Sequence, residues 1–506
     1  MHALLASIPI ALVIVALAGL HWRAASAGLL GLATALVLGV GVFGLGSQTY
    51  PQLGPALAVG GAMAEALFTT ASILWIIFPA LCIYELQQRS GAFDVLQRAL
   101  SRLSEDPRIL VLLVAWFFGL FMEGVAGFGT PVALAAPILV GLGFTPVRAV
   151  TLALIGHAAG VSFGAIGTPV LPLLAATESG VALARASALP HAVLGWMLVA
   201  VLFVMSAPER PRLLDWRWPA LAAVSFFVPY FAVATVVGPE LPALGAALIG
   251  GTVFAVILRS RPSGRGRSDV SQREGTLLRD VIKAVLPYLV LLLLILASRL
   301  IPPLRSLMRE ASWHWTLMGA FSGKLEPLYH PGTLLFAGFL LGGALQGRTR
   351  AELIAAMAGA ARRLTLVLVA LAAMLGLSRI LVHAGMTDAL AAAAAAIGSG
   401  WPLVAPFIGV LGAFITGSAT SSNILFAEFQ QATALTLSMP VAPLLGAQNF
   451  GAAIGNIISP HNIIAGAATV GLASGREGQV MRATLLLCLV YAGAGGVVTA
   501  LLIALQ

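Results

Sequence analysis

Residues 123–131 read Glu-Gly-Val-Ala-Gly-Phe-Gly-Thr-Pro, and residues 416–423 read Thr-Gly-Ser-Ala-Thr-Ser-Ser-Asn. Each cluster interrupts a long apolar run and is followed by a second interruption, at 156–169 and at 446–460 respectively. Inside a bilayer, a backbone freed from its helical hydrogen bonds is tolerated only where protein or a water-lined cavity satisfies it. Interruptions that are paired in two halves of a chain therefore indicate the binding site of a transporter.

The interruptions of the two halves also match each other in sequence. The aligned positions are His157 with Gln448, Gly160 with Gly451, Gly164 with Gly455, Thr168 with Ser459, and Pro169 with Pro460. A weaker match, of residues 90–94 to residues 384–388, precedes them in the same order. The pattern predicts two repeated units.

Composition identifies the class of protein. The chain has 506 residues, of which 59% are hydrophobic and only 9% are charged, whereas a soluble domain carries roughly 25% charged residues. Apolar stretches of about 20 residues, long enough to cross a bilayer, recur along the whole length. We predict an all-α polytopic membrane protein with about 12 to 16 membrane elements, some of them broken helices or re-entrant hairpins.

The net charge of +9 does not indicate a nucleic-acid partner. The basic residues gather in short loops, as cytoplasmic loops do, and form no basic face with interleaved aromatic residues. Cys82 and Cys488 lie in apolar segments, where we expect them to pack rather than to bind a metal.

The basic segment 259–283 predicts the orientation, because loops rich in Arg and Lys stay in the cytoplasm. We count the predicted membrane crossings in both directions from this segment. The count puts most other basic clusters in the cytoplasm as well, and both termini outside. The first interruption then ends a span that leaves the cytoplasm, and the matching one ends a span that enters it. This arrangement predicts an inverted repeat.

The same count divides the chain into two membrane halves. We predict a first half at 1–258 with a repeat core at about 85–172, and a second half at 284–506 with a repeat core at about 364–472. The basic segment 259–283 is the predicted cytoplasmic linker between them.

In the first half, Gly127, Gly129 and Thr130 are predicted to bind an anionic substrate, together with Thr168. Gly and Pro together can end one helix and begin another, which leaves free amide N–H groups and partial positive charge at the new helix N-terminus. The alternative is that the small residues only allow close helix packing.

In the second half, the cluster is richer in hydroxyl and amide groups, which need partners at membrane depth. Some of these hydroxyl groups could instead bond to carbonyl groups of their own helix. The predicted substrate-binding residues of this half are Ser418, Thr420, Ser421, Ser422, Asn423, Asn456 and Ser459.

Three titratable residues lie within the interruptions and are candidates for coupling proton movement to transport: Glu123, His157 and His461. An intramembrane carboxyl group is a functional candidate by default, and histidine titrates near neutral pH. The alternatives are a carboxyl group at a helix end and histidines that are simply hydrogen bonded.

No set of His, Cys, Asp or Glu has the spacing of metal ligands, so we predict no metal site. Ser418 or Ser421 with His461 could form a nucleophilic pair. The aligned Gly-rich run contains no serine at the equivalent place, which argues against an intramembrane enzyme.

The sequence resembles the L-lactate permease family, which also includes glycolate permeases. The resemblance rests on residues 123–133, 163–169, 238–242 and 416–426, and matches continue in the same order from about residue 85 to about residue 485. The chain departs from the family at His157, where a small or amide residue is common, and in its rather short length. The first departure bears on the substrate.

The resemblance implies a secondary transporter of the bacterial cytoplasmic (inner) membrane, with basic loops in the cytoplasm, and no cofactor or enzymatic activity. The implied substrate is L-lactate or a related 2-hydroxymonocarboxylate, such as glycolate or D-lactate, taken up with a proton. The alternatives are a similar transporter for a dicarboxylate or a sulfur oxyanion, a passive channel, and an intramembrane enzyme. The oligomeric state stays open.

Overall fold

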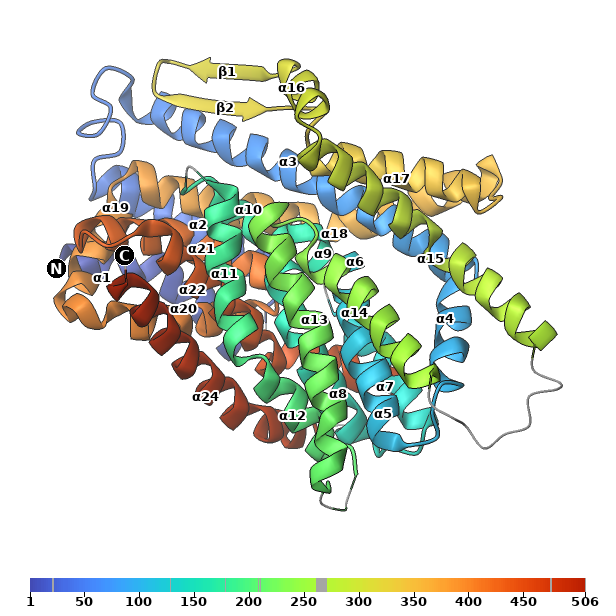
Figure 1. Cartoon of the computed structure of the whole chain (residues 1–506). Helices are drawn as coiled ribbons and strands as arrows, with labels where there is room; N and C mark the ends of the chain where they lie inside the picture. Colours follow the sequence, from blue (N-terminus) through green and yellow to red (C-terminus); the bar gives the residue numbers. More distant parts are fainter. Residues whose placement is uncertain are drawn as a thin grey trace.

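The computed structural model describes residues 1–20, 22–127, 129–177, 179–207, 209, 211–260, 271–473 and 476–505. Nearly all of the described chain is helical (Figure 1). The helices before the basic segment are α1 (His2–Ile14), α2 (Ala24–Gly41), α3 (Gly54–Arg89), α4 (Ala92–Ser101), α5 (Pro107–Val111), α6 (Gly119–Val125), α7 (Thr130–Gly141), α8 (Pro146–His157), α9 (Gly164–Gly167), α10 (Leu171–Leu174), α11 (Gly180–Leu194), α12 (Trp196–Met205), α13 (Arg217–Val236) and α14 (Pro242–Arg259).

Ten more helices follow the basic segment. They are α15 (Ser271–Leu300), α16 (Pro302–Glu310), α17 (Pro331–Leu345), α18 (Arg350–His383), α19 (Met386–Ala394), α20 (Trp401–Thr416), α21 (Ala419–Thr436), α22 (Val441–Gly455), α23 (Pro460–Thr469) and α24 (Glu477–Ala504). The short 3₁₀ and π segments are η1 (Val15–Gly19), η2 (Leu112–Phe118), η3 (Ala158–Phe163), η4 (Thr168–Val170), η5 (Leu213–Trp216), η6 (Ala395–Gly400) and η7 (Asn456–Ile458).

Ten described helical stretches are long and apolar enough to cross a membrane, and twelve are if each of two bent pairs counts as one span. The bent pairs are α11 with α12 and the two parts of α18; shorter apolar helices begin at His2, Thr130 and Pro331. The prediction of an all-α polytopic membrane protein with broken helices is therefore confirmed.

The two halves contain the same order of elements around their interruptions. In the first half, α6 ends, the chain turns, α7 and α8 follow, and the 3₁₀ segment η3 leads into a second break. In the second half, α20, α21, α22, η7 and α23 repeat this order. The chain turns at left-handed glycines, Gly129 (φ 78°) before α7 and Gly417 (φ 73°) before α21, a conformation that costs glycine little.

Two glycines of the second pair of interruptions allow helices to touch. A Cβ atom on Gly156 would lie 2.1 Å from the carbonyl oxygen of Ala115, and one on Gly451 would lie 1.8 Å from that of Pro406. Small residues at these two positions therefore serve close helix packing.

A two-stranded antiparallel hairpin, β1 (Trp313–Leu317) and β2 (Phe321–Leu325), lies against α3 at the top of Figure 1. The buried Phe321 ring packs where Gly61 leaves space on α3, and the backbone N–H of Ser322 donates to Glu65 at 2.9 Å. The sequence pattern did not predict these strands.

The predicted linker 259–283 is only partly described. Helix α14 ends at Arg259, residues 261–270 lie outside the described residues, and α15 begins at Ser271. Residues 271–283, the second part of the predicted linker, thus belong to helix α15.

Candidate functional site

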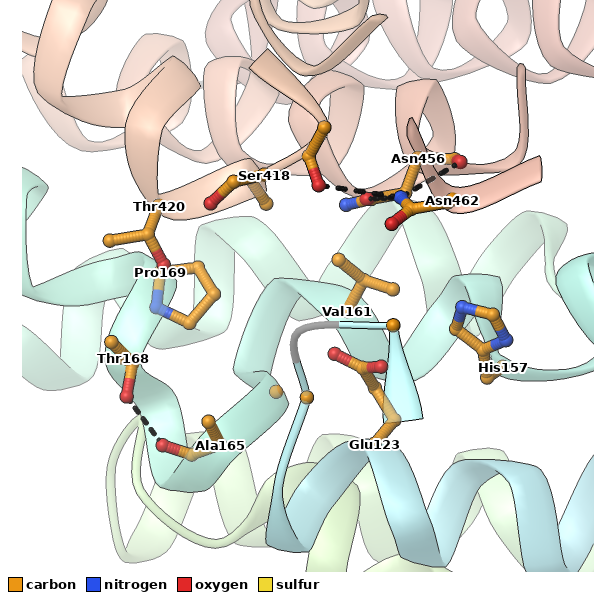
Figure 2. A pocket seen from close by; sticks show the side chains of 15 residues that line it. Glu123, His157, Val161, Ala165, Thr168, Pro169, Ser418, Thr420, Asn456 and Asn462 are labelled. Carbon is orange, nitrogen blue, oxygen red and sulfur yellow. Dashed lines mark hydrogen bonds between the residues drawn. The ribbon is translucent and has the colours of Figure 1, made fainter. Parts of the chain in front are cut away.

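The interruptions of the two halves meet at one small cavity. Figure 2 shows side chains of the first half on one side of it and side chains of the second half on the other. The fifteen lining residues are Glu123, Gly127, Gly129, His157, Val161, Gly164, Ala165, Thr168, Pro169, Gly417, Ser418, Ala419, Thr420, Asn456 and Asn462. The cavity has a volume of about 30 Å³, which is room for roughly two water molecules.

The cavity brings together most, but not all, of the predicted site residues. The predicted residues that line it are Glu123, Gly127, Gly129, His157, Thr168, Ser418, Thr420 and Asn456. The predicted residues that do not line it are Thr130, Ser421, Ser422, Asn423, Ser459 and His461.

The N-terminus of α21 is the clearest group of hydrogen-bond donors at the cavity. Ser418 caps this helix, because its side chain accepts from the backbone N–H of Ser421 at 3.2 Å. Helix geometry leaves the amides of Ala419 and Thr420 without an intrahelical carbonyl partner. Both residues line the cavity, so the positive end of the α21 dipole lies beside it.

The hydroxyl group of Thr420 adds to this group of donors. Its side chain is 4% exposed, and among the described residues none is recorded as its hydrogen-bond partner. A hydroxyl at membrane depth needs a partner, and the cavity is where a ligand or water could supply one.

The N-terminus of α7 differs from that of α21. The backbone N–H and the hydroxyl of Thr130 both donate to the Gly127 carbonyl, at 3.0 and 2.8 Å, and Pro131 has no N–H. Thr168 likewise donates its hydroxyl to the Ala165 carbonyl at 2.5 Å. The first half therefore presents fewer free donors than the sequence pattern suggested.

Glu123 is the only carboxylic acid among the described lining residues, and it is 4% exposed. Glycine backbone surrounds its side chain: a Cβ atom on Gly164 would lie 2.1 Å from Oε1, and one on Gly127 would lie 3.4 Å from the same atom. A Cβ atom on Gly160 would lie 3.4 Å from Cγ of Glu123. The backbone at Gly127, Gly160 and Gly164 therefore lies close to the Glu123 side chain, and we call these three glycines the Glu123 cage.

The two candidate histidines have different positions. His157 is buried in the cavity wall, and its Nδ1 donates to the Ala153 carbonyl at 2.7 Å, which leaves Nε2 as its second polar atom. His461 is exposed and lies outside the lining. Among the described residues, His461 makes no hydrogen bond to Ser418 or Ser421, the serines of the nucleophilic pair considered above. The backbone N–H groups of these serines donate to Thr416 and Ser418.

Asn462 lines the cavity but was not predicted. Its amide Nδ2 donates to the Gly417 carbonyl at 3.4 Å and also bonds Oδ1 of Asn456. Its Oδ1 lies beside Gly129 of the first half. Its position three residues after Ser459, just beyond the interruption at 446–460, was the signal that could have identified it.

Comparison with known proteins identifies the family of this chain. A model of the L-lactate permease family matches residues 2–324 and 318–506. The chain belongs to the L-lactate permease family. The family consists of permeases, so the prediction that the protein is a transporter and not an enzyme is confirmed.

Curated relatives cover almost the whole permease. It is 33% identical to an L-lactate permease of Streptococcus iniae, over 87% of this chain and 92% of the relative. It is 29% identical to the glycolate permease GlcA of Escherichia coli K12, over 99% of this chain and 95% of the relative. An L-lactate permease of the same E. coli strain is 30% identical, over 85% of this chain and 84% of the relative.

A solved structure shares the fold of this permease. The YdaH transporter of Alcanivorax borkumensis matches with a TM-score of 0.55 at 16% identity, over 94% of this chain and 98% of that one. At this identity the match concerns the fold alone.

Proposed function

We propose that this permease takes up L-lactate or a related 2-hydroxymonocarboxylate, such as glycolate or D-lactate, by proton symport across the cytoplasmic membrane. The names of the relatives support the substrate class. One observation carries the proposal. The N-terminus of α21, with the amides of Ala419 and Thr420, and the carboxyl group of Glu123 line the same cavity.

The cavity favours a small monoanion over an anion of higher charge. None of its described lining residues is Arg or Lys, so the attraction for an anion comes from backbone amides and the helix dipole. A helix N-terminus carries only about half of a unit positive charge. The hydroxyl groups of Ser418 and Thr420 are the proposed contacts of the substrate hydroxyl.

Glu123 explains how a proton could accompany the anion. An ionised Glu123 and a bound carboxylate would place two negative charges in one buried cavity, where like charges repel strongly. Protonation of Glu123 removes this repulsion. Proton binding and anion binding then strengthen each other, as linkage requires.

We propose that the cavity, whose volume is about 30 Å³, widens to admit the substrate. Since each half of the chain forms one wall, we propose that transport involves relative movement of the two halves, 1–258 and 284–506. We further propose that the basic loops and the linker face the cytoplasm and both termini face outward.

Uptake into proteoliposomes tests the function. With the membrane potential clamped, an imposed gradient of about one pH unit supplies about 1.4 kcal/mol per proton, which drives roughly tenfold accumulation when one proton accompanies each anion. Uptake of labelled L-lactate above that of protein-free liposomes is the expected result. Competition by dicarboxylates or sulfur oxyanions, and not by short hydroxyacids, would replace lactate with one of those classes. Equilibration without accumulation would mean a channel.

The hydroxyl of Thr420 provides a specific test of the anion site. A Thr420→Val variant keeps the side-chain shape and should lower lactate uptake several-fold, because a hydrogen bond to the uncharged substrate hydroxyl contributes about 0.5–1.5 kcal/mol. The concentration dependence of initial uptake rates measures the change.

A threonine near the other end of the same helix is the matched control. Thr436 is exposed and donates its hydroxyl to the Ala432 carbonyl, so Thr436→Val should transport like the parent protein. Parent-level uptake by the Thr420→Val variant at every lactate concentration would remove Thr420 from the site.

A further inference from the structure

The segment of residues 163–168, here called the reversed segment, has an unusual backbone. Ala165 and Ile166 have positive φ angles of 42° and 56°, and Gly167 has φ 79°. Non-glycine residues rarely adopt this conformation, which persists only where the surroundings impose it. Some contact must therefore hold the reversed segment in place.

Two asparagines of the second half provide that contact. Nδ2 of Asn423, on α21, donates to the Pro169 carbonyl at 2.8 Å, just after the reversed segment. Nδ2 of Asn449, on α22, donates to the Ser162 carbonyl at 3.2 Å, just before it. Both side chains are fully buried. Because the segment belongs to the first half, these bonds connect the two halves.

The asparagines also bond to each other, since Nδ2 of Asn423 donates to Oδ1 of Asn449 at 2.9 Å. Oδ1 of Asn423 accepts from Nε2 of Gln448 at 3.3 Å. Asn423 thus has both polar atoms of its side chain engaged by protein, and neither is left for a substrate.

A histidine outside the cavity anchors the other end of this network. Nε2 of His191, on α11, lies 2.9 Å from the hydroxyl of Ser162, which in turn lies 3.4 Å from the Asn449 carbonyl. His191 is fully buried and did not enter the sequence analysis. The position of Ser162 is therefore determined from two sides.

The reversed segment carries part of the Glu123 cage, because the backbone of Gly164 lies directly against the carboxyl group. Asn423 lies on the same helix as Thr420, about one turn further on. A single helix, α21, thus carries the proposed anion contacts and also the bond that holds the wall of the cage.

We propose that Asn423 and Asn449 are positioning residues that hold the reversed segment against Glu123 and so transmit movement of the α21 N-terminus to that carboxyl group. The proposal rests on the proposed function, in which α21 binds the anion and Glu123 carries the proton. Loss of these bonds should weaken the coupling between proton and anion more than it weakens anion binding.

The test compares two rates in proteoliposomes for Asn423→Leu and Asn449→Leu, which remove the amide donors at nearly constant volume. The first rate is lactate accumulation driven by a pH gradient, and the second is exchange of internal for external lactate at equal pH. We expect accumulation to fall about tenfold or more while the KM of exchange changes by less than about threefold, because the anion contacts remain. The double variant should resemble either single variant, since the two bonds act on one segment.

Thr499→Val is the matched control for loss of a buried hydrogen bond. The Thr499 hydroxyl is buried and donates to the Gly495 carbonyl of its own helix, α24. Both rates should be unchanged in this variant. If a leucine variant does not fold, Asn423→Asp or Asn449→Asp keeps the shape, replaces the amide donor with oxygen, and is measured by the same two rates.

The outcomes separate this proposal from the proposed function. Failure of the parent protein to accumulate lactate under a pH gradient overturns the proposed function. Accumulation by the parent, with accumulation and exchange reduced in equal proportion in the variants, overturns the positioning role. Selective loss of accumulation supports it.

Discussion

Glu123→Gln should abolish lactate accumulation driven by a pH gradient and leave lactate exchange in place. The amide has the shape of a protonated carboxyl group but cannot release a proton, so the anion site stays formed while the coupling is lost. With the membrane potential clamped at zero, the ratio of internal to external lactate should fall to about one, because the proton gradient no longer contributes free energy. Labelled lactate in proteoliposomes measures both the ratio and the exchange rate.

An exposed carboxyl group is the control for this experiment. Glu310 is exposed in α16, so Glu310→Gln should accumulate lactate like the parent protein. Accumulation by the Glu123→Gln variant at the parent level would assign the proton to another group. His157, which lines the same cavity, would then be the next residue to replace.

The second large effect should come from Gly451, where α22 crosses α20. A Cβ atom there would lie 1.8 Å from the carbonyl oxygen of Pro406 and 2.6 Å from its carbonyl carbon. The obstacle is backbone, which cannot rotate away as a side chain does, and overpacking of a close helix contact costs about 1–3 kcal/mol or more. We expect Gly451→Val to lower the yield of folded protein and the melting temperature in detergent.

Gly493→Ala is the corresponding control, since its Cβ atom would meet only Phe407 at an ordinary distance of 3.7 Å. It should have the yield and melting temperature of the parent. A Gly451→Val variant that is equally stable would show that α20 and α22 can move apart at this crossing without loss of the fold.

The sequence was sufficient to predict the class of fold, and residues of the matched interruptions line one cavity. An apolar chain in a bilayer has few alternatives to helices, and matched interruptions in such helices have few explanations other than a shared site. Glu123 became a candidate because a carboxyl group at the end of an apolar run is costly unless it has a partner or a function. It lies in the cavity wall, and its role in transport stays a prediction.

Side-chain partners from the other half could not be predicted. Asn423 has a polar side chain of the kind that binds ligands. Its amide, however, donates to the carbonyl of Pro169, a residue far away in the sequence. Ser422 is likewise buried and donates to the Gly409 carbonyl. Local sequence shows that a polar group needs a partner, but only the packing of distant helices determines whether that partner is protein or substrate.

The difference between the two helix N-termini also depended on local geometry that composition does not show. Thr130 satisfies its own donors through the Gly127 carbonyl, whereas the first amides of α21 remain available. His461 was predicted beside His157 as a proton-coupling candidate, but it is exposed and does not line the cavity. The hairpin at 313–325 was missed although residues 313–317 alternate apolar and polar side chains, which is typical of a strand.

The division of chemistry between the halves has a consequence for the transport cycle. If two repeats of opposite orientation were chemically identical, the outward-open and inward-open states would be related by a two-fold rotation and would have equal free energies. Here the cavity receives its carboxyl group from the first half and its free helix amides from the second. The two halves therefore repeat the same backbone arrangement but contribute different charged and polar groups to the cavity. Under the proposed function, the two open states should differ in their affinity for the proton and the anion, so we expect import and export to have different rates even under equal and opposite gradients.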